Sequence, residues 1–207
     1  MARSGFVRSR SDSGADRFAA MSSATDSSVH SFADVVIRRA TVDDAPLVAT
    51  LAASTFADTF AAENDPADMR AYVATAFGDA VQRAELADPR HVVLIAERDG
   101  DAVGYAMLRD GVAPDGIPGA FVASDSMEIA RLYAVQRHIG AGIGSALMQR
   151  CLTEAVTLGR RTVWLGVWER NARAIAFYER WGFVDVGAQT FTLGSDVQHD
   201  RVMARRV

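Results

Sequence analysis

Apolar residues form two kinds of pattern from about residue 35 onward. Short continuous apolar runs rich in β-branched residues predict buried strands, whereas apolar residues spaced three or four apart predict helices. The predicted strands cover residues 35–39, 91–97, 102–108, 127–135, 162–168, 183–187 and 201–204. The predicted helices begin near residue 45, at Asn64 or Asp65, and near Ile143, with a short one at 81–86 and another from Asn171. This order predicts one α/β domain with a mixed sheet flanked by helices.

Polar residues and glycines mark several boundaries between these segments. Thr41, followed three residues later by Asp44, resembles the capping box at a helix start, and Pro66 suits a first helical turn. The Asp-Gly pair at residues 99–100 lies between two apolar runs, which predicts a tight hairpin turn. Residues 111–124 contain two prolines and three glycines and are predicted to be a surface loop.

Three alternate glycines, Gly140, Gly142 and Gly144, follow the apolar run 127–135 and open a helical pattern. Such a turn directs backbone N–H groups toward one point beside a helix N-terminus, which suits an anion such as a phosphate. Ser145 stands where the dinucleotide fingerprint needs glycine, and a chain without lysine cannot carry the lysine-containing phosphate loop. The alternative is a tight turn that uses glycine only for its backbone freedom.

Composition narrows the class of protein. The chain has 207 residues, 49% of them hydrophobic, and a net charge of -4, with scattered arginines that argue against nucleic acid as a partner. Residues 1–34 are rich in Ser, Ala, Arg and Asp and contain no long apolar run, so we expect a disordered tail and a cytoplasmic protein. Cys151 is the single cysteine, which excludes a disulfide framework, and the four histidines lack ligand spacing, so we expect no metal site.

A later segment carries a family resemblance. The run Asn171-Ala-Arg-Ala-Ile-Ala-Phe-Tyr-Glu-Arg-Trp-Gly-Phe183, after the apolar run 162–168, resembles the GNAT superfamily of N-acetyltransferases. In that superfamily a strand, a loop written Q/R-x-x-G-x-G/A and an N-x-x-A-x-x-F-Y-x-x-x-G-F helix build the acetyl-CoA site. The resemblance covers roughly residues 35–207 and implies a mixed, mainly antiparallel sheet. Residues 165–169, 191–194 and 196–200 are most similar to the PaiA-type spermidine/spermine N-acetyltransferases.

The resemblance also implies how acetyl-CoA binds. The strands ending near Ala134 and Trp168 splay apart, and pantetheine lies between them, bonded to the backbone of Leu132 and Ala134. The implied phosphate loop and helix start comprise Ile139, Gly140, Gly142, Ile143, Gly144 and Ser145. Ile139 occupies the position that usually holds Gln or Arg, so a side-chain contact to phosphate is lost while the backbone N–H groups remain. Asn171 and Ala174 approach the pantetheine arm, although Asn171 is equally suited to capping a helix.

Two residues are candidates for the chemistry, which requires a neutral amine and a stabilised thiolate. The resemblance implies that the Tyr178 hydroxyl lies by the cofactor sulfur as a general acid. Glu128 is the candidate base, because the polyamine acetyltransferases carry a glutamate at the position of Ala130, two residues later on the same strand face. The alternative for Glu128 is a strand glutamate paired with an arginine. Cys151 is interpreted as a buried inert thiol, which favours direct transfer in a ternary complex.

The expected function is transfer of an acetyl group from acetyl-CoA to a primary amine of a small molecule. The resemblance favours a polyamine, as do four acidic residues near the expected acceptor side, namely Asp58, Glu63, Asp65 and Asp68. Those acids are alternatively solvated helix faces. The alternative functions are acetylation of an amino acid or a protein N-terminus, and a non-catalytic acyl-CoA sensor. We expect no membrane partner and allow for a homodimer.

Overall fold

The computed structural model describes residues 34–111, 113, 118, 121, 125–194 and 196–207. The predicted tail, apart from Asp34, and most of the predicted loop 111–124 therefore lie outside the described residues. In the described part, seven strands form one sheet in the order β1-β2-β3-β4-β5-β7-β6. Strands β4 and β5 are parallel and the other neighbouring pairs are antiparallel, which confirms the mixed, mainly antiparallel sheet.

The elements alternate along the chain as the apolar pattern predicts. The strands are β1 (Val36–Arg39), β2 (His91–Arg98), β3 (Asp101–Asp110), β4 (Ser126–Ala134), β5 (Thr162–Trp168), β6 (Val184–Leu193) and β7 (Asp196–Arg206). The helices are α1 (Ala45–Phe60), α2 (Pro66–Ala76), α3 (Asp79–Ala87), α4 (Ile143–Thr157) and α5 (Ala172–Arg180). Short 3-10 turns cover η1 (Val42–Asp44), η2 (Ala61–Glu63) and η4 (Gln136–His138).

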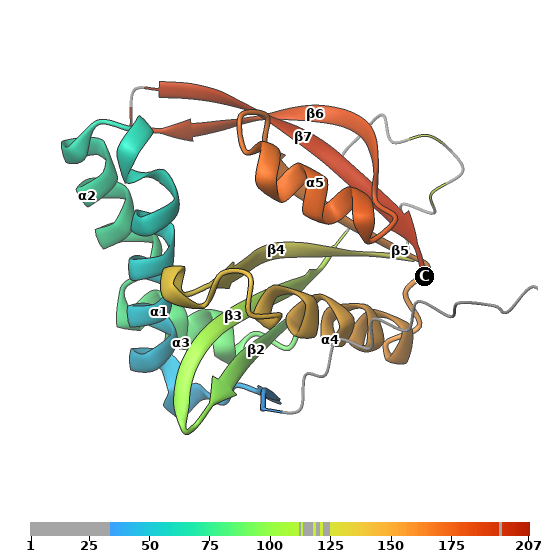
Figure 1. Ribbon diagram of the computed structural model, residues 1–207, viewed down its shortest axis with the longest axis horizontal. Coiled ribbons are helices and arrows are strands. Elements are labelled where there is room, and N and C mark those ends of the chain that lie inside the picture. Colours follow the sequence, from blue (N-terminus) through green and yellow to red (C-terminus); the bar gives the residue numbers. More distant parts are fainter. Residues whose placement is uncertain (1–33, 112, 114–117, 119–120, 122–124, 195) are drawn as a thin grey trace, which may run out of the picture. The chain divides into compact units, whose positions relative to one another are not determined.

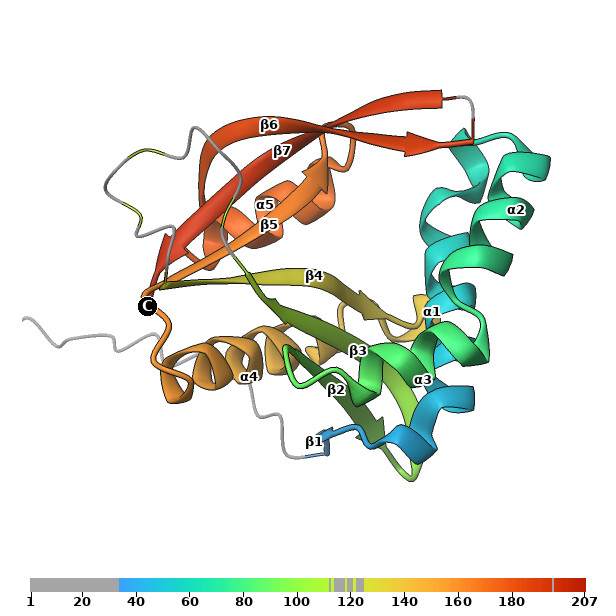
Figure 2. The same cartoon turned by 180° about the vertical axis from the view of Figure 1, so that it is seen from behind.

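Helices cover both faces of the sheet (Figures 1 and 2). One face, here called the α4–α5 face, packs those two helices against inward residues such as Leu94, Leu108 and Leu165. The opposite α1–α3 face packs the first three helices against residues such as Ile95 and Tyr105. Side chains of successive strand residues alternate between these two apolar cores, which is the period of two expected for a sheet buried on both sides.

Local signals at two of the predicted boundaries are confirmed. Asp99 and Gly100 both have positive φ, 54° and 85°, as the hairpin turn between β2 and β3 requires. The side chain of Asp65 accepts hydrogen bonds from the N–H groups of Ala67 and Asp68, and Pro66 is the first residue of α2. The hairpin turn and the start of α2 are therefore each formed by residues that favour the backbone conformation found there.

The last two strands are much longer than predicted. The predicted segments 183–187 and 201–204 cover only part of β6 and β7, which pair from Val184 with Ala204 to Leu193 with Asp196. Most residues of β6 are exposed or half-buried, so its apolar pattern ends early. Strand pairing rather than burial extends it, and Phe191 and Leu193 at its end pack against the α1–α3 core.

An irregularity in β4 lies at the centre of the sheet. The register between β3 and β4 shifts so that Leu108 pairs with Ile129 and Met107 pairs with Arg131, which leaves Ala130 without a partner on β3. Such a β-bulge bends a strand and increases its twist. Ile129 before the bulge and Leu132 after it both belong to the α4–α5 core.

Helix α1 lies in a stretch with the length and apolar composition of a membrane-spanning helix, yet it packs in the protein core. The stretch Val42–Glu63, which contains α1, is long enough and apolar enough to span a membrane. However, Val48, Leu51 and Phe56 are buried against the sheet in the α1–α3 core. Its apolar side is therefore already covered by protein.

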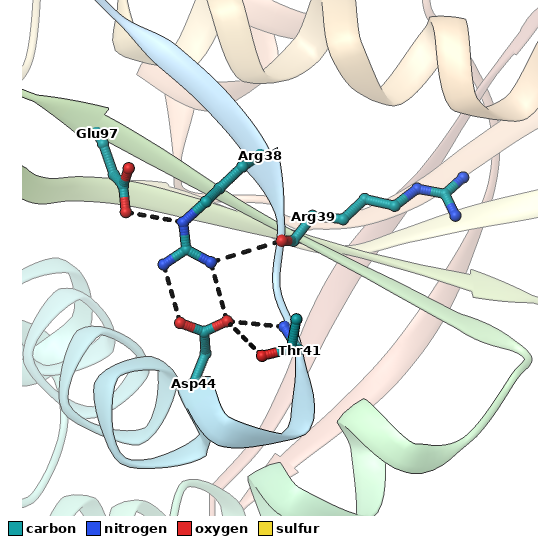
Figure 3. Close-up of polar contacts among 5 residues, drawn as sticks. All are labelled: Arg38, Arg39, Thr41, Asp44 and Glu97. Carbon is teal, nitrogen blue, oxygen red and sulfur yellow. Dashed lines mark hydrogen bonds and ion pairs between the residues drawn. The ribbon is translucent and has the colours of Figure 1, made fainter.

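Arg38 joins three segments at the start of the domain (Figure 3). Its guanidinium donates two hydrogen bonds to the Asp44 carboxylate, at 2.8 and 2.9 Å, and a third to Glu97 on β2 at 2.8 Å. Asp44 also accepts the backbone N–H of Thr41 at 2.7 Å, as the predicted capping pair requires. This network connects β1 and β2 to the turn that starts α1.

The Arg38 guanidinium lowers the pKa of Asp44 from 3.8 to about 2. Ionised Asp44 therefore stabilises the fold fully above pH 3.8, and this contribution is lost as the pH falls through about 2.

We expect Asp44→Asn to lower the free energy of unfolding at neutral pH by about 1 kcal/mol, since it removes charged hydrogen bonds and part of a helix cap. Urea titrations should show this difference shrinking below pH 4, whereas Asp43→Asn, an exposed neighbour, should have little effect at any pH. A deficit that stays constant down to the acid unfolding limit would contradict this electrostatic account.

Candidate active site

The parallel strands β4 and β5 pair for only three residues and then separate (Figures 1 and 2). Their last paired residues are Glu128 and Trp164. Beyond this point β4 remains bonded to β3 on its other side, and β5 remains bonded to β7. The edge of β4 that faces β5, from Ile129 to Ala134, therefore has no strand partner among the described residues. Its backbone N–H and C=O groups are available to an extended ligand in the way that a sheet edge accepts a further strand.

The glycine loop follows directly from this edge of β4. Gly140 and Gly142 have φ values of 88° and 85°, which side chains other than glycine rarely adopt, and Gly142 is the N-cap of α4. The next three residues, Ile143, Gly144 and Ser145, supply first-turn N–H groups that no helical carbonyl can accept. The side chain of Ile143 is buried in the core, so only its backbone is available here. The loop therefore has the chemistry of an anion site at a helix N-terminus.

Ile139 and Arg98 define the outer side of this loop. Ile139 is 39% exposed and contributes no polar group. Arg98, at the end of β2, donates a hydrogen bond of 3.1 Å to the carbonyl oxygen of Ala141. This contact brings an arginine to the glycine loop from another strand, 43 residues away along the chain. Sequence reasoning did not identify Arg98, because nothing near it in the chain resembles a phosphate motif.

Helix α5 forms the other flank of the strand separation. Asn171 is its N-cap and accepts the N–H of Ala174 at 3.1 Å, so the capping role of Asn171 is present in the structure. The N–H of Asn171 also donates to the carbonyl of Trp168 at 2.9 Å, which ties α5 to the end of β5. A β-carbon at Gly144 would lie 3.7 Å from the Phe177 ring, so the first turn of α4 packs closely on α5.

Tyr178 lies on the inner side of α5, against the α4–α5 core. Its ring is half-buried and contacts Phe183, with ring centroids 6.0 Å apart. Burial raises the pKa of Tyr178, so the phenol stays protonated at neutral pH. Among the described residues none accepts or donates a hydrogen bond to its hydroxyl, which leaves that group available to a ligand. Burial also raises the pKa of Tyr133 on β4, and the phenols of Tyr105 and Tyr178 add to this effect.

Glu128 lies where β4 and β5 begin to separate. It is buried, and both Nε and Nη2 of Arg109 donate to its Oε2 atom, at 2.8 and 2.5 Å. The arginine pairing that we gave as the alternative for Glu128 is therefore present. Because Met127 and Ile129 point into the α4–α5 core, Glu128 points to the opposite, α1–α3 face.

The four acids expected near the acceptor lie in different local environments. Asp65 caps α2, and Asp58 and Glu63 are exposed. Asp68 lies against Gly194 at the turn between β6 and β7, which brings that turn onto α2. The four acids thus do not form one inward-facing group in the described structure.

Several polar groups on the α1–α3 face were not identified from the sequence. The Tyr105 hydroxyl and the Trp164 indole N–H are buried and have no hydrogen-bond partner among the described residues. Asp200, on β7, is half-buried, and its carboxylate and the Gln189 amide both lie against Gly166. Cys151, by contrast, is buried as expected, and burial raises the pKa of its thiol. Within the described ranges no group of three His, Cys, Asp or Glu side chains could hold a metal ion.

Comparisons with known proteins agree with this geometry. The model of the acetyltransferase (GNAT) family matches residues 53–183. An uncharacterised N-acetyltransferase of Mycobacterium bovis is 35% identical over 79% of this chain and 98% of its own length. An uncharacterised N-acetyltransferase of Lactobacillus delbrueckii is 28% identical over 78% of this chain and 91% of its own.

Solved structures share the fold at lower identity. The PaiA N-acetyltransferase of Thermoplasma acidophilum, solved in complex with coenzyme A, has a TM-score of 0.67 and 18% identity over 84% of this chain and 99% of its own. A ribosomal-protein-alanine N-acetyltransferase of Brucella melitensis has a TM-score of 0.58 and 24% identity over 83% of this chain and 99% of its own. The strand separation, the glycine loop and the family match lead to one conclusion. The chain belongs to the GNAT family and is an acyltransferase of the N-acetyltransferase class, with acetyl-CoA as its co-substrate.

Proposed function

We propose that this enzyme transfers the acetyl group of acetyl-CoA to a primary amine of a small cationic molecule in the cytoplasm, and that a polyamine is its preferred acceptor. The transfer is direct, with both substrates bound at once. The observation that carries this proposal is the unpaired edge of β4, which leads into the glycine loop, while Tyr178 of α5 packs against the same core as Leu132 and Ala134 of β4.

The unpaired edge and the glycine loop suit the two parts of acetyl-CoA. Backbone groups of Leu132 and Ala134 would bond the pantetheine amides, while the N–H groups at the start of α4 would hold the pyrophosphate. The backbone N–H of Ile139 remains available to phosphate although its side chain is apolar. Asn171 and Ala174 begin the helix beside the pantetheine arm, and the capping bond of Asn171 uses only its side-chain oxygen.

Two side chains have proposed roles in the chemistry. The Tyr178 hydroxyl donates a hydrogen bond to the sulfur as the C–S bond breaks and stabilises the developing thiolate. Glu128 accepts the proton that the amine loses, directly or through water, by its Oε1 atom, because Arg109 occupies Oε2. Cys151 takes no part, since a buried protonated thiol is a poor nucleophile.

The test is release of free thiol from acetyl-CoA with a panel of acceptors. The panel contains spermidine, a diamine, a monoamine, an amino acid and a short peptide with a free N-terminus. We expect turnover to be fastest with spermidine and to give the monoacetylated amine by mass spectrometry. Fastest turnover with the amino acid or peptide would instead support the alternative acceptor class. Binding of acetyl-CoA without thiol release for any acceptor would contradict the catalytic proposal and support a sensor.

A further inference from the structure

Asp200 lies on the α1–α3 face of the sheet, beside the separated part of β5. Its backbone pairs with Trp168 of β5 on one side and with Gln189 of β6 on the other. Met203 of β7 belongs to the α4–α5 core, whereas Val202 packs with Trp164 on the other side. Because strand side chains alternate, Asp200 shares the face of Val202, opposite α5.

The carboxylate of Asp200 extends over Gly166, where β5 has no side chain. A β-carbon placed at Gly166 would lie 3.3 Å from Asp200 Oδ2 and would overlap the Gln189 amide. Gly166 comes two residues after Trp164, the last residue of β5 that pairs with β4. The Asp200 carboxylate and the Gln189 amide therefore lie over the part of β5 that has separated from β4.

Asp200 has no cationic partner among the described residues. Three other buried or half-buried acids are paired with arginine, since Glu85 contacts Arg131, Glu128 contacts Arg109, and Glu154 contacts Arg39 and Arg150. Burial raises the pKa of Asp200, and the hydrogen bond from Gln189 offsets this effect only in part. A half-buried carboxylate without a counter-ion is unfavourable, and a bound cation would relieve that cost.

The surroundings of Asp200 also suit an organic cation. Trp168, its cross-strand neighbour, contacts Phe60 at the end of α1 with ring centroids 6.0 Å apart. This contact places the last residue of α1 beside the end of β5. The Arg170 guanidinium lies over the Trp168 ring, 5.8 Å from its centroid, so this aromatic surface beside a carboxylate already contacts one organic cation.

We infer that Asp200 binds a charged nitrogen of the acceptor, distal to the nitrogen that is acetylated. This inference rests on the proposed function and specifies the acceptor as a molecule with at least two amino groups. The attacking nitrogen must be neutral, so a carboxylate that favours a cation is better suited to the second nitrogen. Asp200 is thus a specificity residue, with Gln189 holding its carboxylate over Gly166.

The test compares putrescine, a diamine, with butylamine, the monoamine of the same carbon chain. Calorimetry on the CoA complex measures the affinity of each amine for the wild type and for Asp200→Asn. We expect the wild type to bind putrescine about 10- to 100-fold more tightly, the size of one charged hydrogen bond, and Asp200→Asn to abolish this preference. Gly166→Ala should weaken the preference as well, because its methyl group displaces the Gln189 amide while the charge of Asp200 remains.

Two controls separate specificity from stability. Asp185→Asn makes the same charge change at an exposed site on β6 and should retain the full preference for putrescine. The melting temperature of Asp200→Asn at neutral pH should equal or exceed that of the wild type, because burial disfavours the ionised carboxylate. A lower melting temperature together with equal losses of affinity for putrescine and butylamine would show that the Asp200 carboxylate has a structural role, and would overturn the inference.

The remaining outcomes distinguish this inference from the proposed function. A putrescine preference that survives in Asp200→Asn, or that is absent from the wild type, overturns the inference even if acetyl transfer to other amines is observed. A preference that depends on Asp200, found in an enzyme that releases no thiol, supports the inference and contradicts the proposed function.

Discussion

Replacing Tyr178 with phenylalanine should lower kcat by roughly 10- to 1000-fold while acetyl-CoA affinity changes little. The variant keeps the ring that packs against Phe183 and removes only the hydroxyl, so the fold should be nearly unchanged. The loss should fall on kcat because the proposed hydrogen bond strengthens as negative charge grows on the sulfur. The measurement is steady-state kinetics with a saturating amine, under conditions where chemistry limits the rate.

Tyr105→Phe provides a matched control for this prediction. It too removes only a phenolic hydroxyl, but the Tyr105 hydroxyl is fully buried and has no hydrogen-bond partner among the described residues. We expect its kcat to stay close to the wild-type value. Wild-type turnover in Tyr178→Phe, or an equal loss in both variants, would exclude Tyr178 as the general acid.

Gly142→Glu should abolish measurable binding of acetyl-CoA. The new side chain would stand at the N-cap of α4, at a φ of 85°, and place a negative charge where the pyrophosphate is proposed to bind. Calorimetry with acetyl-CoA measures the effect directly. The residues that supply the first-turn N–H groups remain, so loss of binding would reflect obstruction and charge rather than loss of donors.

Gly159→Glu is the control at the other end of the same helix. Gly159 also has a positive φ, 72°, and a β-carbon there meets nothing within 4 Å. Both variants therefore carry a similar backbone strain of roughly 1–2 kcal/mol and the same added charge. Gly159→Glu should bind acetyl-CoA with wild-type affinity. Unchanged affinity in Gly142→Glu would mean that the glycine loop does not hold the cofactor.

The sequence predicted those parts of the fold that local patterns encode. The apolar run 162–168 is β5 without change, and the hairpin turn at Asp99 and Gly100 follows from two residues that tolerate positive φ. The ends of β6 could not be predicted in this way. Its exposed residues form a strand because they pair with β7. A prediction from the apolar pattern of β6 alone does not include that pairing.

The candidate site shows the same division between local and distant partners. The capping role of Asn171 could be predicted from the residues next to it in the chain, and the structure contains that capping bond. The partner of Glu128 is Arg109, which faces it only because β3 and β4 pair in a particular register. Asp200, unlike Glu128, has no arginine partner among the described residues, and this difference depends on neighbours from other strands that a local sequence pattern does not contain.

The most direct test of the whole account is a crystal structure of the enzyme with coenzyme A. We predict that pantetheine lies between the separated halves of β4 and β5, bonded to the backbone of Leu132 and Ala134. The pyrophosphate should contact the N–H groups that follow Gly142, and the sulfur should lie within hydrogen-bonding distance of the Tyr178 hydroxyl. Coenzyme A bound outside the separation of β4 and β5, or bound there with its sulfur remote from Tyr178, would contradict the account.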